Sequence, residues 1–91
     1  MPSFFAEFVH TDNGVTCSDM GFMDLSTAQE CSSTVSYATS FNVKANYESS
    51  LSQAHYPKGC FILDWGNIYF NTHSIGKRQR ESTSICKKGS T

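Results

Sequence analysis

Four cysteines, at positions 17, 31, 60 and 86, are the residues of this sequence best suited by type to do chemistry. They follow one another at intervals of 14, 29 and 26 residues, so no two form a close pair such as Cys-x-x-Cys. Structural zinc sites usually take their ligands in such pairs, because one tight turn then presents two thiolates to the metal. None of the three histidines lies at ligand spacing from a cysteine. We therefore expect no metal and no cofactor.

A reactive thiol is also not expected, because a nucleophilic cysteine needs a neighbouring base and the spacing places none beside any of the four. An even number of widely spaced cysteines in a chain of 91 residues is typical of small domains that use disulfides to supplement a modest core. Two disulfides are the expected use, and they can be paired in three ways.

One segment, residues 25–41, has the periodicity of a helix. Thr27 is followed three residues later by Glu30, a capping box in which hydroxyl and carboxylate satisfy backbone N–H groups of the first turn. An apolar stripe at helical spacing follows, formed by Ala28, Cys31, Val35 and Ala38. Cys31 is therefore expected to face inward.

The clearest hairpin lies in "YPKGCFILDWGNIYFNTHSIG", residues 56–76. Cys60 to Leu63 reads as a strand, residues 64–67 as a bend, and Ile68 to Asn71 as the antiparallel return. Apolar residues occupy both faces of the first strand, so we expect this hairpin at the centre of a sheet.

These elements predict an α+β fold, with one helix packed on a small antiparallel sheet. A helix that turns Cys31 inward onto a strand that carries Cys60 favours a bridge between these two layers. Cys17 and Cys86 are then left to tie the two ends of the chain together. The alternative joins Cys17 to Cys31 and Cys60 to Cys86. Each long-loop bridge is expected to contribute roughly 3 to 4 kcal/mol by restricting the unfolded chain.

The chain is expected to be a single domain, residues 1–91, because its length leaves no room for a second core. Residues 1–16 are read as an N-terminal strand and a turn at Asp12-Asn13-Gly14, which leads into a short second strand at 15–17. Residues 17–88 form the four-cysteine domain. Within it, residues 42–59 read as a connection and residues 84–87 as a closing strand.

Several of these motifs resemble a small four-cysteine domain that recurs in proteins of microalgae such as dinoflagellates, haptophytes and cryptophytes. The resemblance covers residues 17–88, and its most specific positions are Pro57, Gly59, Cys60, Tyr69, Phe70, Asn71, Ile85 and Cys86. The family's alanine run after the second cysteine is replaced here by "SSTVSYATSF". The resemblance implies an extracytoplasmic protein and supplies no known activity. The helix-to-sheet bridge also gives a layout similar to the PAN/apple modules of extracellular proteins.

We expect an oxidising location outside the cytoplasm, either extracellular or in the lumen of plastid thylakoids. No apolar run reaches the length of a membrane span, so at most peripheral association with a membrane complex is expected. The start, "MPSFFAEFVH", carries Glu7 and lacks the basic start and long apolar centre of a signal peptide. Any export leader is therefore expected to have been removed.

Charge is unevenly distributed along the chain. Residues 1–43 hold five acidic residues and no lysine or arginine, whereas residues 44–91 hold seven basic residues against three acidic ones. We expect the two halves to face each other in the fold; a charged partner, or front-to-back association of copies, is the alternative. A net charge of −1 argues against nucleic acid as a partner.

No catalytic motif is recognisable, since there is no G-x-S-x-G, no H-E-x-x-H and no phosphate-binding glycine loop. Asp64 and His73 flank the hairpin and could form an acid–base pair, but a surface acid and a solvated histidine explain them better. We expect a protein that is not an enzyme.

Two binding functions are expected instead. The first is a structural or scaffolding module that contacts other proteins or copies of itself; the candidate contact residues are Phe4, Phe5, Phe8, Trp65, Tyr69, Lys77, Arg78 and Arg80. The alternative is a polysaccharide-binding module, in which an aromatic ring stacks on a sugar and polar side chains bind its hydroxyls. Its candidate residues are Trp65, Asn67, Tyr69 and Asn71.

Overall fold

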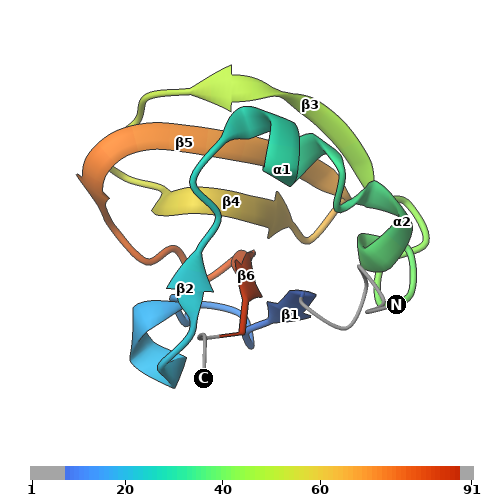
Figure 1. Cartoon of the computed structure of the whole chain (residues 1–91), viewed down its shortest axis with the longest axis horizontal. Coiled ribbons are helices and arrows are strands. Elements are labelled where there is room, and N and C mark those ends of the chain that lie inside the picture. Colours follow the sequence, from blue (N-terminus) through green and yellow to red (C-terminus); the bar gives the residue numbers. More distant parts are fainter. Residues whose placement is uncertain (1–7, 89–91) are drawn as a thin grey trace.

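The structure is a computed structural model that describes residues 8–88 (Figure 1). Its strands are β1 (Phe8–His10), β2 (Met23–Asp24), β3 (Asn46–Leu51), β4 (Pro57–Leu63), β5 (Asn67–Gly76) and β6 (Ser82–Lys87). Its helices are the 3-10 turn η2 (Ser18–Met20), α1 (Ala28–Ser32) and α2 (Val35–Ala38). The strands form one mixed sheet in the order β1-β6-β4-β5-β3, with β2 also paired to β6.

The α+β class and the favoured disulfide pairing are confirmed. Cys31 and Cys60 are bridged with their Cα atoms 5.3 Å apart, and Cys17 and Cys86 with theirs 5.8 Å apart. The first bridge joins α1 to the central strand β4, and the second joins the start of η2 to β6. Within the described residues, 8–88, all four cysteines are bridged and none is free.

The predicted central hairpin is also confirmed. Strand β4 lies between β5 and β6, and it pairs antiparallel with β5 so that Cys60 opposes Phe70 and Ile62 opposes Ile68. Both faces of β4 are buried, since Phe61 is as inaccessible as Cys60. A strand enclosed on both faces explains the uninterrupted apolar run in this part of the sequence.

The helix expected at 25–41 is divided into two short helices. At its start the capping box forms in a shifted version: the Thr27 hydroxyl accepts from the Glu30 N–H at 3.0 Å, while the Glu30 carboxylate accepts from the Ser26 N–H at 3.0 Å. Helix α1 then ends because the buried Thr34 hydroxyl donates to the Cys31 carbonyl at 2.7 Å. Hydroxyl side chains that bind a nearby carbonyl compete with helix continuation. The segment Ser32-Ser33-Thr34 therefore interrupts the helix that the apolar stripe predicts to be continuous.

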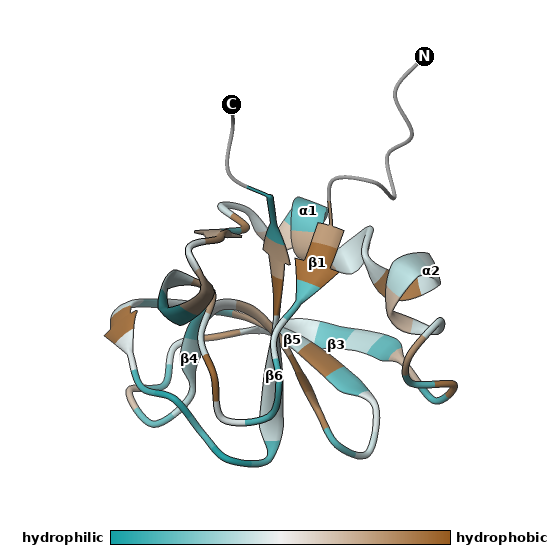
Figure 2. Ribbon diagram, turned by 90° about the horizontal axis from the view of Figure 1, so that it is seen from below, coloured by the Kyte–Doolittle hydropathy of each residue, from teal (hydrophilic) through white to brown (hydrophobic). Residues whose placement is uncertain are grey.

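The second strand predicted at residues 15–17 does not form, and this expectation was wrong. After its turn the chain runs along β6, with the Gly14 N–H donating to the Ser82 carbonyl at 2.9 Å. Thr16 and Asp19 then cap each other's backbone N–H groups and start η2. Strand β1 pairs with the distant strand β6, and the two lie side by side in Figure 2.

Part of the predicted connection at 42–59 is a strand. β3 pairs in parallel with β5, placing Tyr47 beside Ile68, so the sheet is mixed rather than wholly antiparallel. Beyond β3 the chain returns to β4 through a loop that Asn71 holds in place, since its side chain bonds the backbone of Gln53, Tyr56 and Pro57.

The apolar core lies between the two short helices and one face of the sheet. Its buried members are Leu25, Cys31, Ala38, Cys60, Ile62, Ile68, Phe70 and Ile85. Figure 2 shows hydrophobic colour on the central strands and also on outer loops at both sides of the molecule. Those outer apolar positions are part of the candidate site described next.

Candidate functional site

The long strand β5 separates two surface regions, and three of the predicted site residues, Trp65, Lys77 and Arg78, lie in them. At its start is the turn end, which we define as the turn at residues 64–66 together with the packed loop at 42–45. At its finish is the basic groove, an open hollow of about 650 Å³. The groove is lined by Thr16, Ser18, Asp24, Lys58, Ser74, Ile75, Gly76, Lys77 and Arg78.

The basic groove is built where β4 begins and β5 finishes. Gly76 has a φ of 66°, and a Cβ added there would lie 2.5 Å from the backbone nitrogen of Lys58. Only glycine therefore allows the two strands to approach this closely. The Lys77 N–H then donates to the Tyr56 carbonyl at 2.8 Å. The close approach at Gly76 and this hydrogen bond together place Lys58, Lys77 and Arg78 around one hollow.

The opposite wall of the groove comes from η2 and β2. Asp19 accepts a 3.1 Å bond from the Arg78 guanidinium, and the side chain of Arg78 is still 63% exposed. The Thr16 backbone N–H, with a smaller contribution from Arg78, holds the pKa of Asp19 below its usual value. Arg78 is thus oriented by a carboxylate and remains open to solvent.

Asp24, in the same wall, is half-buried beside the backbone of Gly59, where an added Cβ would lie 3.2 Å from the Asp24 Cβ. Burial raises the pKa of Asp24, and the positive charge of Lys58 partly opposes this effect. The groove lining carries three basic side chains against the carboxylate of Asp24, and Asp19 adds a second carboxylate just outside the lining. The groove therefore keeps a net positive charge, which favours acidic ligands.

The turn end carries exposed apolar side chains. Trp65 is 52% exposed and Val43 is 88% exposed. The two segments are in contact, because a Cβ added at Gly66 would lie 2.5 Å from the Lys44 carbonyl oxygen. The exposed indole meets the condition for either a protein contact or a stacked sugar.

The acid–base pair considered from sequence is not assembled. Asp64 lies in the turn before β5 and accepts a 2.6 Å bond from the Asn13 amide. His73 lies near the other end of β5, where its Nδ1 accepts from the backbone N–H groups of Ile75 and Gly76. These two side chains have separate structural roles at opposite ends of one strand.

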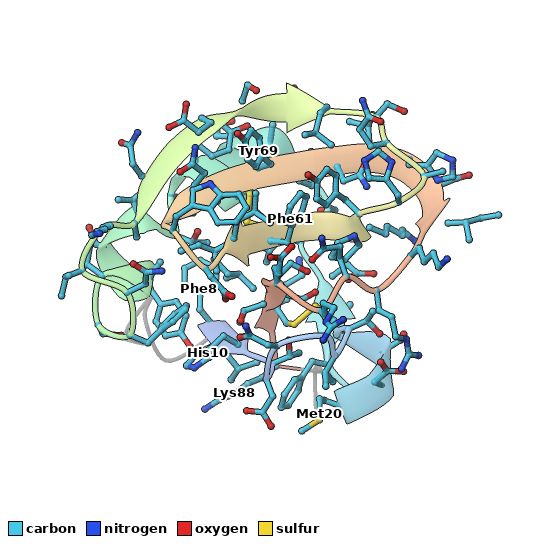
Figure 3. All side chains as sticks on the ribbon, turned by 180° about the vertical axis from the view of Figure 1, so that it is seen from behind. Phe8, His10, Met20, Phe61, Tyr69 and Lys88 are labelled. Carbon is cyan, nitrogen blue, oxygen red and sulfur yellow. A yellow bond between two sulfur atoms is a disulfide. The ribbon has the colours of Figure 1, made fainter. Side chains whose placement is uncertain are left out.

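Phe61 and Tyr69 lie on the face of the sheet turned away from α1 (Figure 3), and the ring of Tyr56 packs against Phe61 to form a row of three aromatic rings. Phe61 is fully buried, stacks on Tyr56 at 5.1 Å and contacts Tyr69 at 5.8 Å between ring centroids. Tyr69 is half-buried, and its hydroxyl lies 3.5 Å from the Asn67 amide. Asn71 is 1% exposed, so it has no free surface to offer a sugar and its glycan-binding role is withdrawn.

The candidate contact residues outside these regions have different positions. Phe8 is half-buried with its ring 5.9 Å from that of Tyr37, so it contributes to an internal aromatic cluster. Phe4 and Phe5 lie outside the described residues. Arg80 is exposed but does not line the basic groove.

Two ion pairs in the fold join acidic residues of the N-terminal half to basic residues of the C-terminal half. The ion pairs Asp19–Arg78, at 3.1 Å, and Glu30–Lys87, at 3.3 Å, each join the acidic N-terminal half to the basic C-terminal half. The two halves therefore face each other, as expected.

Asp24, Lys58 and Ile75 were missed as candidate site residues. Each is unremarkable in its own segment, and they meet only because β2, β4 and β5 converge. No local motif could have identified them.

Among residues 8–88, no cluster of three or more histidine, cysteine, aspartate or glutamate side chains could hold a metal ion. In the same part of the chain, no helix has the length and apolar character needed to cross a membrane. No protein-family model, curated protein or solved structure matches this chain.

Proposed function

We propose that this protein is a non-catalytic scaffold module that binds other proteins and holds them in a fixed arrangement. The observation that carries the proposal is the exposure of apolar side chains at both ends of β5. Trp65 and Val43 are exposed at the turn end, and Ile75, 79% exposed, lines the basic groove. At the turn end the two exposed apolar side chains lie on contacting segments, and neighbouring exposed apolar groups are typical of surfaces that a partner covers; at the groove the single apolar side chain of Ile75 adds to a basic lining.

The cross-links support a scaffold rather than an adaptable binder. One disulfide fixes α1 to the centre of the sheet and the other fixes the η2 segment to β6. A body constrained in this way loses little conformational freedom when it binds, so more of the contact energy remains as affinity. The continuous strand β5, paired on both sides, itself keeps the turn end and the groove at a fixed separation.

The two disulfides are compatible with an oxidising compartment. We propose an extracellular assembly, or an assembly in the lumen of an algal plastid that bridges pigment–protein complexes. This choice of compartments rests on the resemblance of residues 17–88 to the microalgal four-cysteine domain. Homo-oligomers are included, since a second copy can serve as the partner.

The test is gentle purification of the tagged protein from the organism that encodes it, followed by cross-linking mass spectrometry. We expect a complex of fixed stoichiometry with cross-links near both ends of β5. Trp65→Ser should release the partner at the turn end, and Ile75→Ser the partner at the groove. The exposed Ser52 provides a control, because Ser52→Ala should leave the complex intact. Recovery of the wild-type chain alone would contradict the proposal.

A polysaccharide-binding function is the second candidate, and the exposure of Trp65 specifically favours it. The half-buried ring of Tyr69, with Asn67 beside its hydroxyl, adds a polar aromatic position on the same hairpin. Retention on a polysaccharide column that is lost in Trp65→Ser, with no protein complex recovered, would select this function over the scaffold.

A further inference from the structure

We propose that the basic groove binds an extended acidic peptide segment of a partner protein. This inference rests on the proposed scaffold function and specifies the chemistry of one of its contacts. The groove is the larger of the two hollows described here, about 650 Å³ against about 280 Å³ for the one beside the turn end.

The charge of the lining selects an acidic ligand. Lys58, Lys77 and Arg78 face the hollow, and Asp24 is the only acidic residue among the lining positions. Asp19 holds Arg78 from outside the lining through a single guanidinium nitrogen, Nη2. A guanidinium carries five N–H donors, so a ligand carboxylate can bind Arg78 without displacing Asp19.

The remaining lining groups select a peptide over a sugar. None of the lining residues is aromatic, so the groove offers no flat ring on which a sugar could stack. It offers instead the exposed apolar side chain of Ile75, which lines the same hollow as the cation of Lys77. The Ser74 hydroxyl, and one hydroxyl of the mutually bonded pair Thr16 and Ser18, can donate to the carbonyl groups of an extended backbone. Acidic side chains that alternate with apolar ones would complement this lining.

Binding is tested by fluorescence anisotropy with a fluorescein-labelled peptide of alternating glutamate and leucine, at low salt. Lys58→Gln and Arg78→Gln should each weaken binding by roughly three- to tenfold, because exposed charge pairs are individually modest. Asp24→Asn should strengthen binding by about the same factor, since it removes the carboxylate that opposes the ligand. Lys44→Gln is the matched control, because this exposed lysine lies at the turn end and should leave binding unchanged.

Near-ultraviolet circular dichroism and the mass of the unreduced protein establish that each variant keeps its fold and both disulfides. Failure of the wild-type protein to bind the peptide would overturn the inference. Equal loss in Lys44→Gln would overturn it too, because the binding would then be non-specific. Preference for a sulfated oligosaccharide over the peptide would assign the groove to an acidic glycan instead.

These outcomes are separable from the scaffold proposal. A native complex that survives in Lys58→Gln and Arg78→Gln, and is lost in Trp65→Ser, would refute the groove as a peptide site while leaving the scaffold function in place. If no native complex is recovered with the wild-type protein, the scaffold function is refuted whatever the result with the peptide.

Discussion

Two regions of this small fold are held together by different forces. The layered half consists of β3, β4 and β5 under α1 and α2, and it encloses apolar side chains such as Ile68 and Phe70. The polar half consists of β1, β2 and η2 gathered around β6, and its buried residues include four with hydroxyl groups, Thr11, Ser82, Thr83 and Ser84. Each half has one disulfide.

In the polar half, hydrogen bonds that involve side chains connect β6 to the segment at residues 11–15. The buried Thr11 hydroxyl donates to the Val15 carbonyl at 2.7 Å and accepts from the Ser84 N–H at 3.0 Å. The Thr83 hydroxyl donates to the Asn13 side chain at 2.8 Å. Polar groups can be buried at little cost only where such partners are in place.

The difference shows how a chain with little apolar sequence completes its fold. In the layered half the packing of apolar side chains orders the segments. In the polar half hydrogen-bonded side chains and a disulfide add to the packing of Ile85, although the buried Ser84 hydroxyl has no partner among the described residues. The basic groove forms at the junction of the two halves, with Ser18 and Asp24 from the polar half facing Lys58 and Ile75 from the layered half. The shape of the groove therefore depends both on apolar packing and on the hydrogen bonds and disulfide of the polar half.

The largest effect should come from removing one disulfide at a time. In the chain-entropy picture, the bridge spanning 69 residues contributes about 4 kcal/mol and the bridge spanning 29 about 3.5 kcal/mol. We expect the pair Cys17→Ala and Cys86→Ala to abolish amide protection in β1, β2 and η2 while the β4–β5 hairpin stays protected.

Hydrogen exchange read by mass spectrometry measures this pattern. The pair Cys31→Ala and Cys60→Ala serves as the comparison and should lower protection throughout, because its cysteines lie in the apolar core. Identical protection patterns in the two double variants would show that the halves are not distinct.

Core packing gives the next largest effect. Ile68 is fully buried in the layered half, so Ile68→Ala should lower the free energy of unfolding by about 3 kcal/mol through lost burial and the cavity left behind. Ile75→Ala on the same strand, where the side chain is 79% exposed, should change it by less than about 0.5 kcal/mol. Urea denaturation measures both, and similar values for the two variants would contradict the packing described here.

The polar half should be sensitive to an isosteric loss of one hydroxyl. Thr11→Val leaves the Ser84 N–H and the Val15 carbonyl without this partner, which should cost about 1 to 3 kcal/mol. Thr72→Val is the control, since the exposed Thr72 hydroxyl donates to the Leu51 carbonyl near solvent and water can replace it. Thermal unfolding should show the Thr11 variant melting first; a neutral result would mean that packing also holds the polar half.

The smallest effect concerns pH. The Ser26 N–H, assisted by Lys87, holds the pKa of Glu30 below its ordinary value of 4.5. The unfolded chain therefore binds the proton more readily, so this contribution is complete above pH 4.5 and is lost as the pH falls through the lowered pKa. Glu30→Gln should reduce stability at neutral pH by less than about 1 kcal/mol, because the pair with Lys87 is partly exposed.

The same variant should show a shallower loss of stability on acidification below pH 4.5 than the wild type. Urea midpoints measured across that range test the sign. A steeper acid loss in Glu30→Gln would show that another carboxylate dominates there.

Features that depend on neighbouring residues were predictable from the sequence. The unbroken apolar run from Cys60 to Leu63 predicts a central hairpin strand, because side chains alternate between the two faces of a strand and both faces here are apolar. The inward stripe of the helix brings Cys31 onto that hairpin, and this predicts the pairing of all four cysteines. The capping pair of Thr27 and Glu30 likewise places the start of α1.

Features that depend on contacts between distant segments were not predictable from the sequence. The partners of β1 and β3 were not predictable, because each short strand carries too few apolar residues to specify which edge it joins. Trp65 could be named as a site residue but not assigned an exposure. The groove required Asp24, Lys58 and Arg78 to meet from separate segments, and packing together with the glycine approach at Gly76 brings them together. Sequence patterns record the periodicity of single elements, whereas the meeting of elements follows from the burial and hydrogen bonding of the whole chain.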